Sequence, residues 1–414
     1  MSNIKKLNQL AKLAVRVGVN VQKNQNVVIR STIESKKLVS LITKNAYDAG
    51  ANRVSVIWSD DEISKINFKS QSKETLSKIP EYIASQYKYY VENNYCFISV
   101  SSPNPGYFSD VNSEKLQSFQ VASNKMLGFF RSHMMGNKSQ WTIVASANEN
   151  WAKKVFPEKT DKDRLESWWN LIFEVSRIDE TKDIVEIWKE HNNKLLERSK
   201  WLNGQNFKKL IFKNNLGTDL EVELVKDHIW VGGGETTTKG VYFNPNIPTE
   251  ENFTMPYKFG VNGMVHSSKP LSYQGKIIKN FWFKFDKGKV IDYDAEEGLD
   301  ALKNLFSVDE GSSYAGEIAL VENSSPVSKT GKTIYSTLFD ENASCHMALG
   351  KAYPMNIKNG INSNIEDLIK RGYNNSLSHV DFMFGTKDMN ISGIKENGEK
   401  VDFFIDGEFS IWFF

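Results

Sequence analysis

The sequence predicts two domains, an α/β domain in the N-terminal half and an α+β, β-rich domain in the C-terminal half. In residues 1–204, apolar strands alternate with amphipathic helices, a pattern typical of a mostly parallel sheet with flanking helices. In residues 205–414, short strands follow one another with few helices between them. The chain of 414 residues is also longer than the roughly 250–300 residues at which a single hydrophobic core stops growing.

The N-terminal domain begins with an expected helix, because Ile4, Leu7 and Ala11 recur at helical spacing and Gly18 is suited to end it. Short apolar, β-branched runs predict the strands of the sheet at 26–31, 53–59, 96–102 and 141–147. Amphipathic stretches predict helices at 35–51, 72–85 and around 116–126. A helical segment at about 161–202 would link the two domains or form a lid.

Composition and motifs exclude several kinds of partner. A net charge of +2 provides no strong field for nucleic acid or an anionic membrane, so neither is expected as a partner. The first strand is not followed by G-x-G-x-x-G, and the chain has no G-x-x-x-x-G-K-[ST], which argues against nucleotide binding. Cys96 and Cys345 lie far apart and form no CxxC pair, so a disulfide framework or a thiolate zinc site is not expected.

The location of the protein is predicted from two further absences in the sequence. The N-terminal residues lack the continuous apolar stretch of a signal peptide, and no run of about 18 apolar residues occurs in the chain. We therefore expect a soluble cytoplasmic protein.

The C-terminal domain begins with a predicted hairpin at 207–225, where alternating residues flank the turn NNLG. Further short strands are expected at 228–233, 277–285, 289–294, 317–322, 379–384 and 401–407. The strand at 379–384 is unusual because it carries a histidine and an aspartate in an apolar run. On a strand, His379 and Asp381 share one face, since successive side chains alternate. The pair is either half of a metal site or a structural hydrogen bond, and the strand alone leaves both interpretations open.

Other candidate ligands occur in three earlier segments. Glu250 and Glu251 lie in NIPTEENFTMP, and Glu317 lies at the start of an apolar strand in YAGEIALVE. ENASCHMALGKAYP contains Glu341, His346 and Tyr353; if this segment is helical, His346 and Tyr353 point the same way, about two turns apart. Buried carboxylates are costly unless they are paired or bind a metal. A set of carboxylates and imidazoles without thiolate suits Zn²⁺, Co²⁺ or Mn²⁺, and its size suits two ions.

The segments NIPTEENFTMP, YAGEIALVE, TLFDENASCHMALGKAYP and SHVDFMFGT, in this order, resemble the signature segments of the aminopeptidase T / aminopeptidase S family of metalloaminopeptidases. The resemblance covers essentially the whole chain. It implies a cytoplasmic, dimeric exopeptidase that removes N-terminal residues from peptides with broad preference, using two divalent metal ions (Zn, Co, Mn or Mg) bound in the domain at 205–414. The metal ligands that it implies are Glu251, Glu317, Glu341, His346, His379 and Asp381.

In the mechanism that follows from this resemblance, two metal ions activate a shared water and polarise the scissile carbonyl. We expect Glu317 to bridge the ions and Glu250 to act as general base, although adjacent residues of an extended chain face opposite ways. Tyr353 is expected to be a ligand or to stabilise the oxyanion. Two alternatives remain at this stage: another two-metal hydrolase of the phosphoesterase type, and a non-enzymatic protein with a structural metal.

Overall fold

The structure, a computed structural model, describes residues 2–411. The chain divides into two compact units, Met1–Asn192 with Gly234–Pro248, and Asn193–Gly233 with Thr249–Phe414. The division falls inside helix α10 (Ile184–Gln205), and residues 234–248 return to the first unit. The domain boundary at 204/205 stays a prediction.

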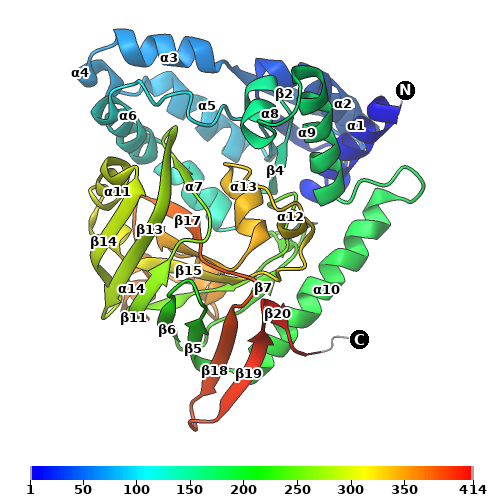
Figure 1. Cartoon of the computed structure of the whole chain (residues 1–414). Helices are drawn as coiled ribbons and strands as arrows, with labels where there is room; N and C mark the ends of the chain where they lie inside the picture. Colours follow the sequence, from blue (N-terminus) through cyan, green and yellow to red (C-terminus); the bar gives the residue numbers. More distant parts are fainter. Residues whose placement is uncertain (1, 412–414) are drawn as a thin grey trace. The chain divides into compact units, whose positions relative to one another are not determined.

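The first unit is built on a four-stranded parallel sheet in the order β2-β1-β3-β4, which confirms the predicted fold class. Figure 1 labels two of its strands, β2 and β4, together with the helices around them. The strands are β1 (Asn26–Thr32), β2 (Arg53–Ser59), β3 (Tyr95–Ser101) and β4 (Trp141–Ala145). β1 pairs on both sides, and its residues Val27, Val28 and Ile29 are fully buried, as expected for a central parallel strand.

Helices connect and flank these strands. They are α1 (Ser2–Leu13), α2 (Lys36–Asp48), α3 (Asp61–Ser70), α4 (Lys73–Leu76), α5 (Glu81–Glu92), α6 (Ser113–Met126), α7 (Gly128–Met135), α8 (Glu149–Val155) and α9 (Asp161–Val175). A π-helical turn, Ala14–Gly18, extends α1, and the short strands β8 (Glu235–Thr236) and β9 (Tyr242–Phe243) pair within the returning segment. The prediction of a single helix at 72–85 is wrong. Pro80 separates α4 from α5, because proline lacks the N–H that a continuous helix requires. In the described part of the chain, no helix is long and apolar enough to cross a membrane.

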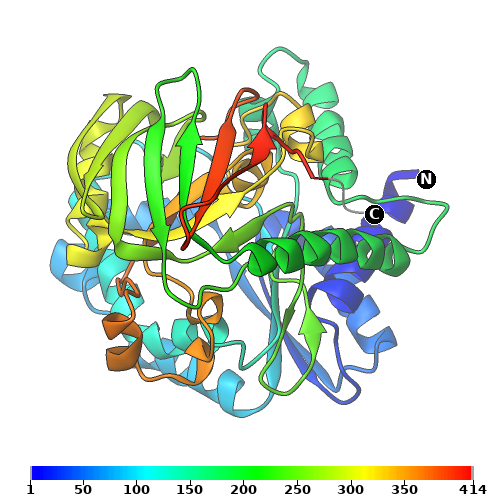
Figure 2. The same cartoon turned by 90° about the horizontal axis from the view of Figure 1, so that it is seen from below.

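The second unit contains two sheets. The larger has nine strands, in the order β12-β13-β11-β6-β5-β18-β19-β20 with β14 paired to β13. Figure 2 shows β5 and β6, which form the hairpin predicted at 207–225, beside β18 and β19 from the C-terminal part of the chain. The strands are β5 (Phe207–Lys213), β6 (Asp219–Leu224), β11 (Pro256–His266), β12 (Leu271–Tyr273), β13 (Lys276–Asp286), β14 (Lys289–Glu297), β18 (Asn390–Lys395), β19 (Lys400–Ile405) and β20 (Glu408–Phe409).

The smaller sheet has five strands in the order β17-β16-β15-β10-β7. These strands are β7 (Val231–Gly232), β10 (Asn252–Thr254), β15 (Ala315–Leu320), β16 (His346–Gly350) and β17 (His379–Met383). The remaining helices of the unit are α11 (Leu299–Phe306), α12 (Pro326–Lys329), α13 (Thr337–Asp340) and α14 (Ile365–Lys370).

One face of the five-stranded sheet packs on the nine-stranded sheet to form the core of the second unit. Ile318 of β15, Met347 of β16 and Phe382 of β17 belong to this buried cluster. The ring of Phe382 lies edge-on to Phe283 of β13, with centroids 5.0 Å apart. Because side chains alternate along a strand, the residues next to Met347 and Phe382 point to the other face of the sheet.

Candidate metal centre

Five predicted ligands meet on the second face of the five-stranded sheet. Glu317 lies on β15, His346 on β16, and His379 and Asp381 on β17, while Glu251 immediately precedes β10. All but His379 are less than 9% exposed, and the side chain of His379 is 20% exposed. The face therefore holds a buried cluster of carboxylates and imidazoles contributed by segments that are distant in the sequence.

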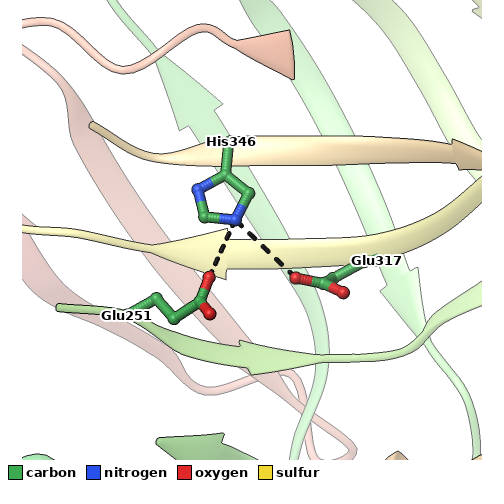
Figure 3. Close-up of side chains that lie close together, drawn as sticks. All are labelled: Glu251, Glu317 and His346. Carbon is green, nitrogen blue, oxygen red and sulfur yellow. Dashed lines mark ion pairs between the residues drawn. The ribbon is translucent and has the colours of Figure 1, made fainter. Parts of the chain in front are cut away.

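The five side chains form two groups that could each hold a metal ion, and Glu317 belongs to both. In the first group, His346 Nε2 lies 2.9 Å from Glu251 Oε2 and 3.7 Å from Glu317 Oε1 (Figure 3). In the second group, His379 Nε2 lies 3.5 Å from Asp381 Oδ1 and 3.7 Å from Glu317 Oε2. The two oxygens of Glu317 thus face different histidines, which is the arrangement that a bridging carboxylate requires.

Glu317 reaches this face because a β-bulge interrupts β15. Ala315 pairs with Leu349 and both belong to the core, whereas Glu317 pairs with Ala348 on the opposite face. In a regular strand, residues 315 and 317 would point the same way, so the extra residue, Gly316, turns the carboxylate toward the histidines. A Cβ on Gly316 would lie 2.3 Å from the Gly350 carbonyl oxygen, so only glycine fits this close approach.

Backbone carbonyl groups orient both imidazoles. His379 Nδ1 donates to the Lys351 carbonyl oxygen at 2.6 Å, and His346 Nδ1 donates to the Ser344 carbonyl oxygen at 3.3 Å. Since a carbonyl oxygen only accepts, the Nδ1 atom carries a proton in each ring. Nε2 is then the atom that faces the carboxylates and has the lone pair for a metal when it is deprotonated.

The charges of the cluster depend strongly on one another. Burial disfavours the charged form of both histidines, but the carboxylates around them outweigh this effect. The pKa of His346 is raised well above its ordinary value by Glu251 and Glu317. Asp381 and Glu317 raise the pKa of His379 to about 9. Without a metal ion, His379 therefore holds its proton at neutral pH, and the pKa of His346 is shifted in the same direction.

The pKa values of the carboxylates are also shifted, because these groups are buried close to other charges. Burial raises the pKa of Glu317 to about 7. Burial, followed by the negative charges of Glu251 and Asp381, raises the pKa of Glu341 well above its ordinary value. For Asp381, burial works in the opposite direction, but the positive charge of His379 prevails and lowers the pKa.

The donor set fits divalent metal ions. Among the described residues, Asp381 Oδ1 is buried without a well-formed hydrogen bond, and its nearest positive charge is His379 Nε2 at 3.5 Å, so a cation would add the close partner that this oxygen lacks. The raised pKa values of the two imidazoles and of Glu317 indicate that the cluster favours added positive charge, and metal binding would compete with protons at these groups. Cys345 is not part of the set, because its thiol faces the Val321 carbonyl oxygen at 3.6 Å and burial raises its pKa to about 11. Oxygen and nitrogen donors without thiolate suit Zn²⁺, Co²⁺ or Mn²⁺.

Glu341, Tyr353 and Glu250 lie around this cluster. Glu341 is 7% exposed and opens a 3₁₀ turn, Glu341–Ala343, and its charge interacts with those of Glu251 and Asp381. The ring of Tyr353 lies edge-on to His379, with centroids 4.9 Å apart. Glu250 is 7% exposed, and its backbone N–H donates to the side chain of Asn342 at 2.7 Å.

The helical alternative considered for the segment with His346 and Tyr353 does not apply. His346 and Tyr353 do not share a helix, because His346 begins strand β16 and Tyr353 follows the end of that strand. They reach the same site because Tyr353 packs on His379 of the neighbouring strand β17. In contrast, the predicted shared face of His379 and Asp381 is confirmed by the 3.5 Å separation of their side chains.

Three residues around the site have no role predicted from the sequence. Ala348 lies between Glu317 and Asp381 in the strand register, Gly316 forms the bulge, and Asn342 contacts Glu250. Nothing in the residue types themselves distinguishes them from ordinary core positions. Only their adjacency to suspected ligands in AGE, MALG and DENA was a signal that could have identified them.

Known proteins match the chain along almost its whole length. The family described as thermophilic metalloprotease (M29) matches residues 3–409. Aminopeptidase AmpS of Bacillus subtilis (strain 168) is 43% identical over 405 residues, which cover 98% of both chains. Aminopeptidase T of Thermus aquaticus is 35% identical over 395 residues, covering 95% of this chain and 96% of the relative.

A solved structure extends the match to three dimensions. Wild-type AmpT from Thermus thermophilus superposes with a TM-score of 0.90 at 34% identity, covering 98% of this chain and 99% of the other. The match confirms the fold class predicted for both halves, and the matches together confirm the family resemblance predicted from the sequence. The chain therefore belongs to the thermophilic metalloprotease family M29.

Proposed function

We propose that this M29 protein holds two divalent metal ions on the buried face of its five-stranded sheet and uses them to hydrolyse the first peptide bond of peptides. It is a metal-dependent aminopeptidase, in keeping with the family and the curated relatives along its whole length. The observation that carries the two-ion proposal is the position of Glu317. One of its oxygens faces His346 and the other faces His379, each at 3.7 Å.

The proposed ligands divide between the two sites. Glu251 and His346 would serve one ion, His379 and Asp381 the other, and Glu317 both. Glu341 is proposed as a further ligand, because its carboxylate is buried among these charges. When bound, the ions would supply a water of lowered pKa and polarisation of the scissile carbonyl.

The remaining steps belong to side chains of the chain itself. Glu250 is proposed to take the proton of the attacking water and to deliver it to the leaving amine. It precedes β10, so the strict alternation of a paired strand does not apply to Glu250 and Glu251. The hydroxyl of Tyr353 is proposed to donate a hydrogen bond to the developing oxyanion, with its ring held against His379 and Phe253.

The substrate would be a peptide with a free N-terminus and little restriction on its first residue. Either one of the ions or a carboxylate such as Glu341 would bind the α-amine. A homodimer and a cytoplasmic location are further proposals, supported by the sequence resemblance described above.

A single panel of assays tests the proposed function. Metal-depleted protein is supplied with Co²⁺, Zn²⁺, Mn²⁺ or Mg²⁺ and offered free-amine peptides, N-acetylated peptides and a phosphodiester. We expect metal-dependent cleavage of the free-amine peptides alone. Equal cleavage of the acetylated peptides would contradict the exopeptidase assignment, and cleavage of the phosphodiester alone would favour a phosphoesterase. Tightly bound metal without any hydrolysis would favour a structural role.

A further inference from the structure

Two segments of the candidate centre lie outside the paired strands of the sheet, so backbone hydrogen bonds between strands do not fix their positions. Glu250 and Glu251 precede the paired residues of β10, and Glu341 lies in a short 3₁₀ turn rather than in the sheet. The two segments are separated by about ninety residues of chain, yet both must place carboxylates at one buried cluster. Their relative position therefore depends on side-chain contacts between them.

Asn342 makes the contact that joins the two segments. Its Oδ1 accepts the backbone N–H of Glu250 at 2.7 Å. Its Nδ2 donates to the Leu338 carbonyl oxygen at 2.9 Å, one turn earlier in its own helical segment. Since both ends of the amide are bonded, the orientation of the side chain is fixed and Asn342 cannot move without displacing Glu250.

The backbone of Asn342 is held as well. Its carbonyl oxygen accepts a hydrogen bond from the Ser325 hydroxyl at 2.8 Å, and the same hydroxyl accepts the N–H of Ser328 at the start of α12. Asn342 is fully buried. On the other side of the acidic pair, the side chain of Asn252 donates to Ser199 and to the Leu195 carbonyl oxygen, both at 2.8 Å. Residues 250 and 251 are thus anchored at both ends.

The chemistry of this position favours asparagine. The amide offers an acceptor to Glu250 and a donor to Leu338 without adding a charge. An aspartate would lose the donor and add a negative charge to a buried site that already contains several carboxylates. An alanine would leave the Glu250 N–H without this acceptor and free the turn to shift.

We propose that Asn342 is a positioning residue of the metal centre. It fixes the turn that carries Glu250 and Glu251 relative to the turn that carries Glu341, so that Glu251 meets His346 and Glu250 faces the reacting water. The inference rests on the proposed function, and it concerns how the site is held together rather than which groups react.

The test compares Asn342→Ala with Asn203→Ala. Asn203 is a control from the same unit, because its amide also bonds a backbone N–H and a carbonyl oxygen, both of Trp230. Unlike Asn342, Asn203 is exposed, so its variant tests the loss of the same pair of hydrogen bonds outside the core. Three measurements are made on both variants: binding of Co²⁺ to metal-free protein by equilibrium dialysis, the absorption spectrum of bound Co²⁺, and the steady-state constants on a free-amine peptide.

We expect Asn342→Ala to weaken Co²⁺ binding or to lower kcat by about 10- to 100-fold, as for other residues that orient ligands. The Co²⁺ spectrum should change, and Asn203→Ala should leave all three measurements within about twofold of the parent, the scale of noise for a distant site. If Asn342→Ala and Asn203→Ala differ only in thermal stability, Asn342 is an ordinary core residue.

A second variant covers the case in which Asn342→Ala does not fold. Asn342→Ser retains a polar group for a bridging water but is too short to reach both partners, and it should show the same defects. Unchanged Co²⁺ affinity, spectrum and kcat in Asn342→Ser would overturn the proposal. If the parent protein itself binds no Co²⁺ and cleaves no peptide, the proposed function fails instead, so the two failures are distinguishable.

Discussion

Glu317 and Asp381 lie on either side of Ala348 in the five-stranded sheet: Ala348 on β16 pairs with Glu317 on β15 and with Asp381 on β17. All three side chains point to the face that holds the histidines. Side chains opposite one another on paired strands are about 4.5–5.5 Å apart at Cβ, so a larger residue at 348 would reach both carboxylates. The small methyl group of Ala348 leaves space at the point where the two candidate metal-ligand groups, which share Glu317, meet.

The first prediction concerns this space. Ala348→Leu should abolish binding of at least one metal ion, and peptide hydrolysis with it, because the larger side chain occupies the position between Glu317 and Asp381. Overpacking of a core costs about 1–3 kcal/mol in stability, so a control must share that cost. Ala301→Leu, a buried alanine of α11 in the same unit, should lose stability while keeping its metal. Equal metal content in both variants would show that the space at 348 is not needed.

The second prediction separates the two ions. His379→Ala removes a ligand of one group and should leave about one ion per chain, held by Glu251, Glu317 and His346, with activity reduced to background. The N-terminal unit should remain folded, because it has a sheet and a hydrophobic cluster of its own. Metal content by elemental analysis and unfolding by circular dichroism measure the two effects. His228→Ala is the matched control, because His228 is a buried histidine bonded to the Val225 carbonyl oxygen, and this variant should keep full metal content and turnover. If His379→Ala also keeps full metal content and turnover, His379 has only a structural role.

The third prediction separates the two adjacent glutamates. Glu250→Gln should keep both ions and lower kcat by about 10²- to 10⁴-fold, the usual contribution of a general base. Glu251→Gln should instead weaken metal binding, because Glu251 Oε2 is the oxygen closest to His346 Nε2 in the first group, at 2.9 Å. Metal affinity and kcat at saturating metal are measured for both variants. The reverse result, metal loss in Glu250→Gln and base-like behaviour in Glu251→Gln, would exchange the two roles.

The fourth prediction concerns pH and the metal-free protein. The pKa of His379 is raised to about 9 and that of Glu317 to about 7, so the folded protein binds more protons than the unfolded chain between about pH 4.5 and 9. For both groups, stability is present at low pH and is lost as the pH rises through the folded-state pKa. The melting temperature of metal-free protein should therefore fall as the pH is raised from about 5 to 9.

Metal should remove most of that pH dependence, because it replaces the protons on these groups. The same competition predicts that the affinity for Co²⁺ rises with pH up to about 9 and falls more steeply below about 7, where Glu317 also gains a proton. Thermal scans of both forms, with chelator competition across this range, provide the measurement. A metal-free protein whose stability rises with pH would contradict the proton assignment.

Much of the fold could be predicted from local sequence pattern. The strands of the parallel sheet are short apolar runs, and their limits agree with the predicted ones to within two residues. The break in the helix at Pro80 and the strand that begins at His346 are harder to predict from the sequence. In the second case an apolar run with a histidine is compatible with either period, and only pairing with β15 and β17 decides between them.

The residue types available for metal chemistry can be read from the sequence. The shared face of His379 and Asp381 also follows from it, because side chains on a strand alternate with a period of two. Tertiary structure alone decided where Glu317 points. Regular alternation would place Ala315 and Glu317 on the same face, and the bulge at Gly316 separates them. The bulge arises from the pairing of β15 with β16 and the close approach of Gly350, contacts between segments that no local pattern records.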